Sequence, residues 1–196
     1  MKNQTFRSKV GWVFGWAWIV FAAWNTWDLI AHGSMPSALI AGAVLGVITL
    51  VVFLLALRPA IVAEQGGVRV RNPLRNAYVP WNAVGDVHVT HSIIIEAGHT
   101  TIRCWTPQAT ARERARATAR AGRTAKTQQT MTPGERAAAE AVAGRTHADF
   151  VAQQLSDMSQ TRSGDSTGET AVTWSPSALA AVAATVVLVV VTVILA

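Results

Sequence analysis

The sequence predicts an α+β membrane protein with an N-terminal transmembrane helical hairpin, a small antiparallel β module, a basic helical hairpin and a single C-terminal transmembrane helix. Three observations predict this fold class. The 196-residue chain has three long apolar runs, two near the N-terminus and one at the C-terminus. Short alternating runs broken by turn residues lie between them and are typical of strands. Arginines then recur at helical spacing among alanines.

The three apolar runs are long enough to cross a bilayer. They cover residues 11–31, 37–57 and 176–196, and only the first contains a charge, Asp28, near its far end. As a helix, each run would be about 31 Å long, which matches a hydrocarbon core of about 30 Å. A cleaved signal peptide does not fit the first run, because its apolar part is too long and another span follows after a short turn.

The distribution of basic residues predicts the orientation of these spans. Positive residues flank the N-terminal hairpin on one side only: Lys2, Arg7, Lys9 and Arg58. The turn between the two spans contains no Lys or Arg. The positive-inside rule therefore predicts a multi-pass plasma-membrane protein whose N-terminus and soluble region are cytoplasmic and whose C-terminus lies at the outer face. The net charge of +6 fits loops that face anionic lipid, and the single cysteine, Cys104, requires no oxidising compartment.

Residues 59–107 predict a compact β module. Valines and arginines alternate through residues 68–71, so they would point to opposite faces of a strand. Six short strands are expected, at residues 61–63, 68–71, 77–81, 86–91, 93–95 and 100–105. A sheet this small needs a helix against its open end, and the segment that follows could supply one.

A motif in this module resembles a known family. Residues 67–75 read GVRVRNPLR, and residues 79–81 (VPW) and Val84 follow. This order resembles the bacterial PH-like domains, in particular those of the actinobacterial membrane proteins of the low-molecular-weight protein antigen family. The resemblance implies a partly open PH-like barrel and no known reaction. The third apolar run and the Ala/Arg-rich segment depart from the family pattern.

Several residues of the motif have expected roles. Asn72 and Pro73 predict a turn, since proline restricts its own φ and disfavours helix in the residue before it. Trp81 is expected in the barrel core, with ligand stacking as the alternative. The strand and hairpin arginines could bind an anionic phospholipid headgroup, or form a solvated face near an anionic membrane. These arginines are Arg69, Arg71 and Arg75.

Residues 108–157 predict a basic helical region. Four arginines at spacings of 4, 4 and 3 form one stripe along a helix: Arg112, Arg116, Arg120 and Arg123. We expect this stripe to contact the membrane surface or an acidic protein partner. RNA is a less favoured alternative, because aromatic residues that stack on bases are missing. Residues 132–135 (TPGE) predict the start of a second helix that runs to about Ser156. Residues 158–175 are predicted to be a flexible linker.

No constellation in the sequence predicts catalysis, a metal site or a cofactor. His88 and His91 would lie on opposite faces of a strand, and the Gly-Asp-Ser sequence at residues 164–166 has no strand beside it. The expected function is therefore a non-enzymatic, membrane-anchored adaptor or scaffold for a protein partner. The alternatives are a module that binds anionic phospholipid headgroups and an accessory subunit of a larger membrane complex.

Overall fold

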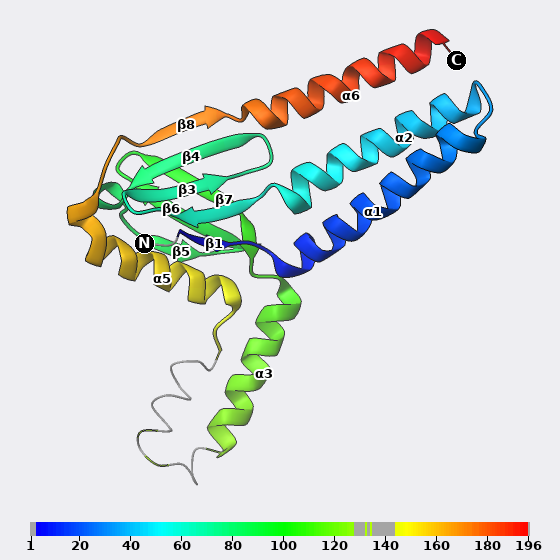
Figure 1. Ribbon diagram of the computed structural model, residues 1–196. Coiled ribbons are helices and arrows are strands. Elements are labelled where there is room, and N and C mark those ends of the chain that lie inside the picture. Colours follow the sequence, from blue (N-terminus) through cyan, green and yellow to red (C-terminus); the bar gives the residue numbers. More distant parts are fainter. Residues whose placement is uncertain (1–2, 128–131, 133, 135–143, 196) are drawn as a thin grey trace.

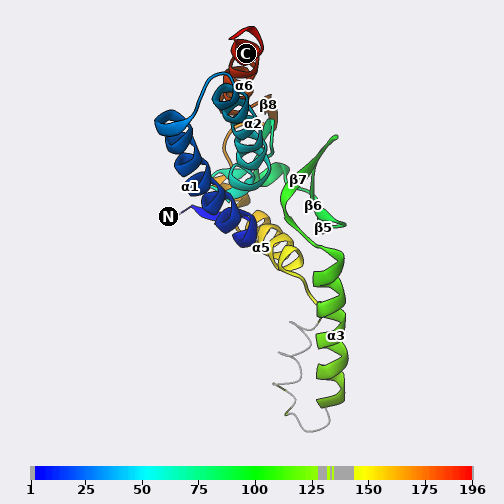
Figure 2. The same ribbon diagram turned by 90° about the vertical axis from the view of Figure 1, so that its right-hand side faces the viewer.

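The chain forms a β module from one end of which three helices extend (Figure 1). The computed structural model describes residues 3–127, 132, 134 and 144–195. The helices that leave the module at this end are α1 (Lys9–His32), α2 (Ser37–Val52) and α6 (Pro176–Leu195). A view turned by 90° shows the same common direction (Figure 2).

The module contains two antiparallel sheets. The five-stranded sheet has the order β1-β2-β3-β4-β8, and the three-stranded sheet has the order β5-β6-β7. The strands are β1 (Gln4–Phe6), β2 (Ala60–Ala63), β3 (Gly67–Arg71), β4 (Arg75–Pro80), β5 (Val87–Val89), β6 (Ser92–Ala97), β7 (Thr100–Gln108) and β8 (Ala171–Trp174). Strands β2 to β7 are the six that the sequence predicts. Strands β1 and β8, from opposite ends of the chain, form the two edges of the larger sheet.

The alternating pattern of the strands produces the core. Val68 and Val70 are fully buried, while the arginines between and after them face outward, as their alternation predicts. Trp81 lies in the core with 1% of its surface exposed, which confirms its expected position. Its indole N–H donates to the backbone oxygens of Glu64 and Gln65 at 3.1 and 2.9 Å, so the one polar atom of this side chain is satisfied.

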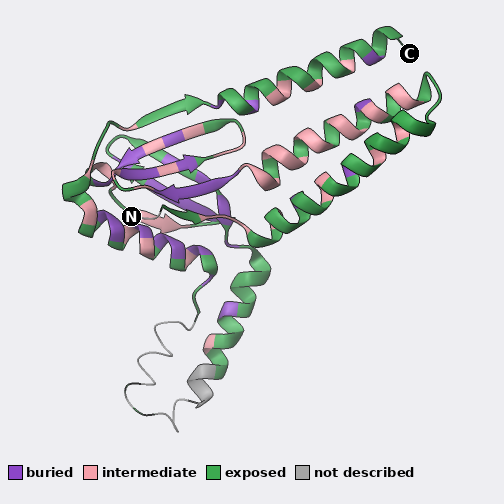
Figure 3. Ribbon diagram, viewed as in Figure 1, coloured by how far each residue is buried: buried purple, intermediate pink, exposed green. Residues whose placement is uncertain are grey.

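Helix α5 (His147–Arg162) covers the open side of the module (Figure 3). Its buried apolar residues join the core of the two sheets: Ala148, Val151, Ala152, Leu155 and Met158. The helix begins with a capping box in which Thr146 and Asp149 bond to each other's backbone N–H. The segment directly after β7 therefore does not supply the covering helix. That segment, α3 (Ala111–Thr127), presents alanine as its main apolar residue, which gives it little surface to bury.

Two expectations about the C-terminal half are wrong. A continuous helix over residues 132–156 is interrupted before α5, because Gly144 has a φ of +81° and Thr146 is extended. Most of the predicted start of that helix, including Pro133 and Glu135, lies outside the described residues. The predicted linker at residues 158–175 contains the end of α5, the 3₁₀ turn η4 (Ser163–Asp165) and β8. Its Ser/Thr-rich composition suggested a linker, but its backbone pairs with β4, a strand far away in the sequence.

The extended helices pack side by side. Trp18 of α1 donates a hydrogen bond from its indole nitrogen to the hydroxyl of Thr49 in α2 at 3.1 Å. Helix α2 continues into a π-helical turn, η1 (Phe53–Leu57), and α6 lies alongside α2. Within the described part of the chain, Ser37–Leu57 and Pro176–Leu195 are long and apolar enough to cross a membrane. Helix α1 is long but less apolar, so the span expected at residues 11–31 stays a prediction.

Candidate functional site

Three arginines gather at the end of the module from which the helices leave. Arg58 lies between η1 and β2, Arg71 ends β3, and Arg75 begins β4. Cross-strand pairing sets Arg71 opposite both Ala60 of β2 and Asn76 of β4. We call Arg58, Arg71 and Arg75 the junction arginines.

The junction arginines carry uncompensated positive charge. Arg58 donates from Nη2 to the side-chain oxygen of Asn76 at 2.6 Å, while its Nη1 is buried without a hydrogen-bond partner. Burial, and secondly the nearby charge of Arg71, lower the pKa of Arg58. Among the described residues, no carboxylate forms an ion pair with any junction arginine. This end of the module therefore favours an anionic environment.

The predicted headgroup trio does not form one site. Arg69 makes two bonds to the carboxylate of Glu64, at 2.6 and 3.1 Å, and its guanidinium lies 5.2 Å from the centre of the Tyr78 ring. The bond to Glu64 raises the pKa of Arg69 and neutralises its charge. Arg75 stacks over Trp174 at 4.8 Å, and Arg71 is exposed. Of the trio, Arg71 and Arg75 keep a positive charge that no carboxylate of the described residues pairs with.

Helix α3 carries the predicted basic stripe in an exposed position. Arg112, Arg116, Arg120 and Arg123 are all exposed. The helix starts beside the first turn of α1 and then projects away from the end at which α1, α2 and α6 leave (Figures 1 and 2). Only the first part of the stripe can therefore lie near the ends of those helices, and the distal part points away from them.

A pocket lies where α3, the end of β7, η1 and the first turn of α1 meet. Its volume is about 570 Å³, and we call it the junction pocket. Arg112 and Arg116 form its basic wall, and Trp105, with 42% of its surface exposed, lies among its apolar residues. Sequence reasoning missed this pocket, because its walls come from three stretches of the chain that are far apart in the sequence. The signal in the sequence was limited to the places of Val10, directly before the first apolar run, and Leu55, near the end of the second.

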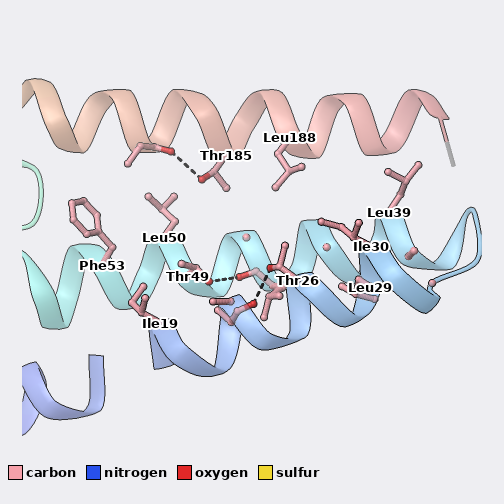
Figure 4. A pocket seen from close by; sticks show the side chains of 18 of the residues that line it. Ile19, Thr26, Leu29, Ile30, Leu39, Thr49, Leu50, Phe53, Thr185 and Leu188 are labelled. Carbon is pink, nitrogen blue, oxygen red and sulfur yellow. Dashed lines mark hydrogen bonds between the residues drawn. The ribbon is translucent and has the colours of Figure 1, made fainter. Parts of the chain in front are cut away.

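A second, apolar groove of about 850 Å³ runs between α1, α2 and α6 (Figure 4). Three threonines line it, and each hydroxyl donates to a backbone oxygen four residues earlier in its own helix. The distances are 2.8 Å for Thr26, 2.7 Å for Thr49 and 2.9 Å for Thr185. The groove therefore presents small and apolar surface with its hydroxyls already satisfied.

Two of the polar residues considered for catalysis or metal binding, His88 and Ser166, have structural partners. His88 lies 3.0 Å from the carboxylate of Asp86, and Ser166 donates to the side-chain oxygen of Asn82 at 2.7 Å. No group of three or more His, Cys, Asp or Glu residues that could hold a metal occurs in the described ranges. Burial raises the pKa of Cys104 to about 12, so its thiol is a poor nucleophile at neutral pH.

Comparison with known proteins agrees with this architecture. A family model described as a bacterial PH domain matches residues 58–126, so the chain contains a bacterial PH-like domain. The match begins at Arg58, spans β2 to β7 and ends within α3. It leaves out β1, α5 and β8. Neither the curated proteins nor the solved structures gave a significant match.

Proposed function

We propose that the bacterial PH-like domain of this chain is held at the cytoplasmic face of the plasma membrane and acts there as a non-enzymatic adaptor for another protein. One observation carries the proposal. The apolar helices leave the module together at one end, and the basic helix α3 projects away from that end (Figure 1). If a membrane surrounded α1, α2 and α6, the distal part of α3 would lie in the aqueous phase.

The anchoring part of the proposal rests on helix length and on charge. Helices α2–η1 and α6 match the thickness of a hydrocarbon core, and α1 lies beside α2 as a third span. The junction arginines lie at the module end of these helices, where basic residues favour the cytoplasmic leaflet. The turn between α1 and α2 and the C-terminal end of α6 lie together at the far end (Figure 1), which supports a cytoplasmic module and an outer C-terminus.

The adaptor part rests on the distal half of the stripe. Arg120 and Arg123 lie beyond the junction pocket, on the part of α3 farthest from the apolar helices. Such a basic surface fits an acidic protein partner. The alternative headgroup site on the trio is weaker, because Glu64 already neutralises Arg69. The likeness to the low-molecular-weight protein antigen family is part of the proposal and rests on the motif at residues 67–84.

Co-purification in mild detergent tests the adaptor role. The variant Arg120→Gln with Arg123→Gln removes two charges from the distal stripe. The control Arg103→Gln with Arg114→Gln removes two exposed charges outside it. We expect a fixed protein partner to be retained by the wild type and by the control, and lost from the stripe variant. Retention by the stripe variant, or no fixed partner with the wild type, contradicts the proposal.

Accessibility reporters test the topology. One reporter at Gln65, in the turn between β2 and β3, and a second appended to the C-terminus are probed in intact cells. We expect the first to be protected and the second to be labelled from outside. Labelling of both from one side contradicts the proposed orientation.

A further inference from the structure

The junction pocket lies at the depth where spanning helices meet lipid headgroups. Val10 belongs to the first turn of α1, and Leu55 and Ala56 belong to η1, the last turn of the second apolar helix. All three line the pocket. If these helices span the bilayer, the pocket opens at the border between acyl chains and phosphates.

One wall of the pocket is basic, and no carboxylate of the described residues forms an ion pair with it. Arg112 and Arg116 are four residues apart, so they lie on one side of α3. Glu113 also lines the pocket, but its carboxylate accepts bonds from the backbone N–H and the hydroxyl of Thr110, at 3.1 and 3.3 Å. In the described part of the chain, neither Arg112 nor Arg116 forms an ion pair. Two guanidinium groups are therefore available to one anion.

Apolar residues also line the pocket, and some of them belong to an unusual turn of helix. Trp105 and Pro59 line the pocket beside Leu55. Trp105 is large and 42% exposed, which suits an interfacial position. In η1 the N–H of Arg58 bonds to the carbonyl oxygen of Phe53 at 2.9 Å, five residues back, and such π turns occur often at functional sites.

We infer that the junction pocket binds an anionic phospholipid of the surrounding membrane. Arg112 and Arg116 hold the phosphate, while Trp105 and Leu55 contact the glycerol and the first acyl carbons. The inference rests on the proposed membrane anchoring. The headgroup site then lies outside the trio Arg69, Arg71 and Arg75. Arg112 and Arg116 bind lipid, whereas Arg120 and Arg123 bind the protein partner.

Native mass spectrometry of the full chain tests the site. Protein released from nanodiscs that contain equal amounts of phosphatidylglycerol and phosphatidylcholine is scored for retained lipid. We expect the wild type to retain phosphatidylglycerol preferentially. The variant Arg112→Gln with Arg116→Gln should weaken this retention by at least about tenfold, because two charge-assisted bonds are lost. The control Arg103→Gln with Arg114→Gln, with the same change in charge, should behave as the wild type.

A second variant separates a lipid site from a site for free phosphate. Trp105→Ala removes apolar wall and leaves both arginines in place. We expect it to reduce lipid retention, and we expect inorganic phosphate not to displace lipid from the wild type. Equal retention by the pocket variant and the control, or no preference for the anionic lipid, overturns the inference. So does displacement by inorganic phosphate.

The outcomes also separate this inference from the proposed function. A chain that is stripped from membranes by carbonate refutes the anchoring, and the lipid site falls with it. The chain can instead stay in the membrane and keep its partner while the pocket variant retains lipid as the control does. That result refutes the lipid site alone. Protection of Cys104 from alkylation reports that each variant is folded. If the double variant is not, Arg116→Gln alone provides the test.

Discussion

The side-chain oxygen of Asn72 accepts a hydrogen bond from the backbone N–H of Trp105 over 2.8 Å. The side-chain nitrogen of Asn72 donates to the backbone oxygen of Arg103, also over 2.8 Å. The side-chain amide of Asn72 thus takes the place of a backbone peptide on a neighbouring strand, which would make the same two hydrogen bonds to β7. It joins the β3–β4 turn of the larger sheet to the smaller sheet.

Replacing Asn72 with alanine should destabilise the module. Two exposed bonds to backbone groups of β7 would be lost, at a cost of about 0.5–1.5 kcal/mol in the free energy of unfolding. Thermal unfolding of the full chain in detergent, followed by tryptophan fluorescence, measures this loss. Asn82→Ala is the control, because Asn82 is exposed and its side-chain bond within the described residues is to Ser166. Equal midpoints for the two variants would show that the bridge is not stabilising.

Cys104 should react slowly with alkylating reagents in the folded protein. The thiol is fully buried, and burial raises its pKa from 9.0 to about 12. Because the folded state favours the neutral thiol, Cys104 contributes stability below about pH 9 that is lost as the pH rises toward 12. Labelling with iodoacetamide at pH 8, compared with the denatured chain, measures the protection. Asn72→Ala should weaken it, since Cys104 lies between the two residues that Asn72 binds. Equal labelling of native and denatured chains would argue against the burial.

Leu155→Ala should strongly destabilise the module if α5 closes the core. Leu155 is 1% exposed, and its truncation leaves a cavity that costs about 2–5 kcal/mol. Phe150, on the other side of the same helix, is 59% exposed, so Phe150→Ala should change stability by less than about 0.5 kcal/mol. Chemical unfolding of both variants makes the comparison. A similar loss from both would mean that α5 does not pack as described.

Gly46 and Gly42 should respond differently to alanine. A Cβ at Gly46 would lie 2.6 Å from the end of the Leu188 side chain in α6, whereas a Cβ at Gly42 would meet no atom within 4 Å. Gly46→Ala should therefore push the end of the Leu188 side chain aside, and the cost of this shift should offset the helix preference of alanine. Gly42→Ala should be neutral or stabilising by up to about 1 kcal/mol, since alanine favours helix. Thermal denaturation in detergent distinguishes them, and equal effects would contradict the packing.

Local patterns in the sequence predict much of the module. The alternation of valine and arginine in β3 depends only on neighbouring residues, so it predicts which side chains are buried. The partnership of Glu64 and Arg69 also had a local signal, because Glu64 directly follows the strand predicted at residues 61–63 and Arg69 lies at the start of the next one, at residues 68–71. Reading the three arginines of the trio as one surface overlooked this acidic neighbour.

Pairing between distant segments was harder to predict. β8 is four residues long and becomes a strand only because β4 offers it an open edge. The covering helix was expected immediately after β7, although apolar spacing favours α5, where Val151, Leu155 and Met158 lie on one face. The junction pocket needs three distant stretches of the chain brought together, and no local pattern records their contact.

Trimming the chain to the matched range, residues 58–126, would leave an incomplete barrel. β2 would lose β1, β4 would lose β8, and the face under α5 would be open to water. A fragment that keeps both sheets and α5 starts at Gln4 and ends at Trp174, and it necessarily includes α1 and α2. Because Phe6 pairs with Ile61 in an antiparallel register, a short hairpin loop can replace those two helices. A fragment in which such a loop joins the end of β1 to the start of β2 is the route to a water-soluble form for crystallisation.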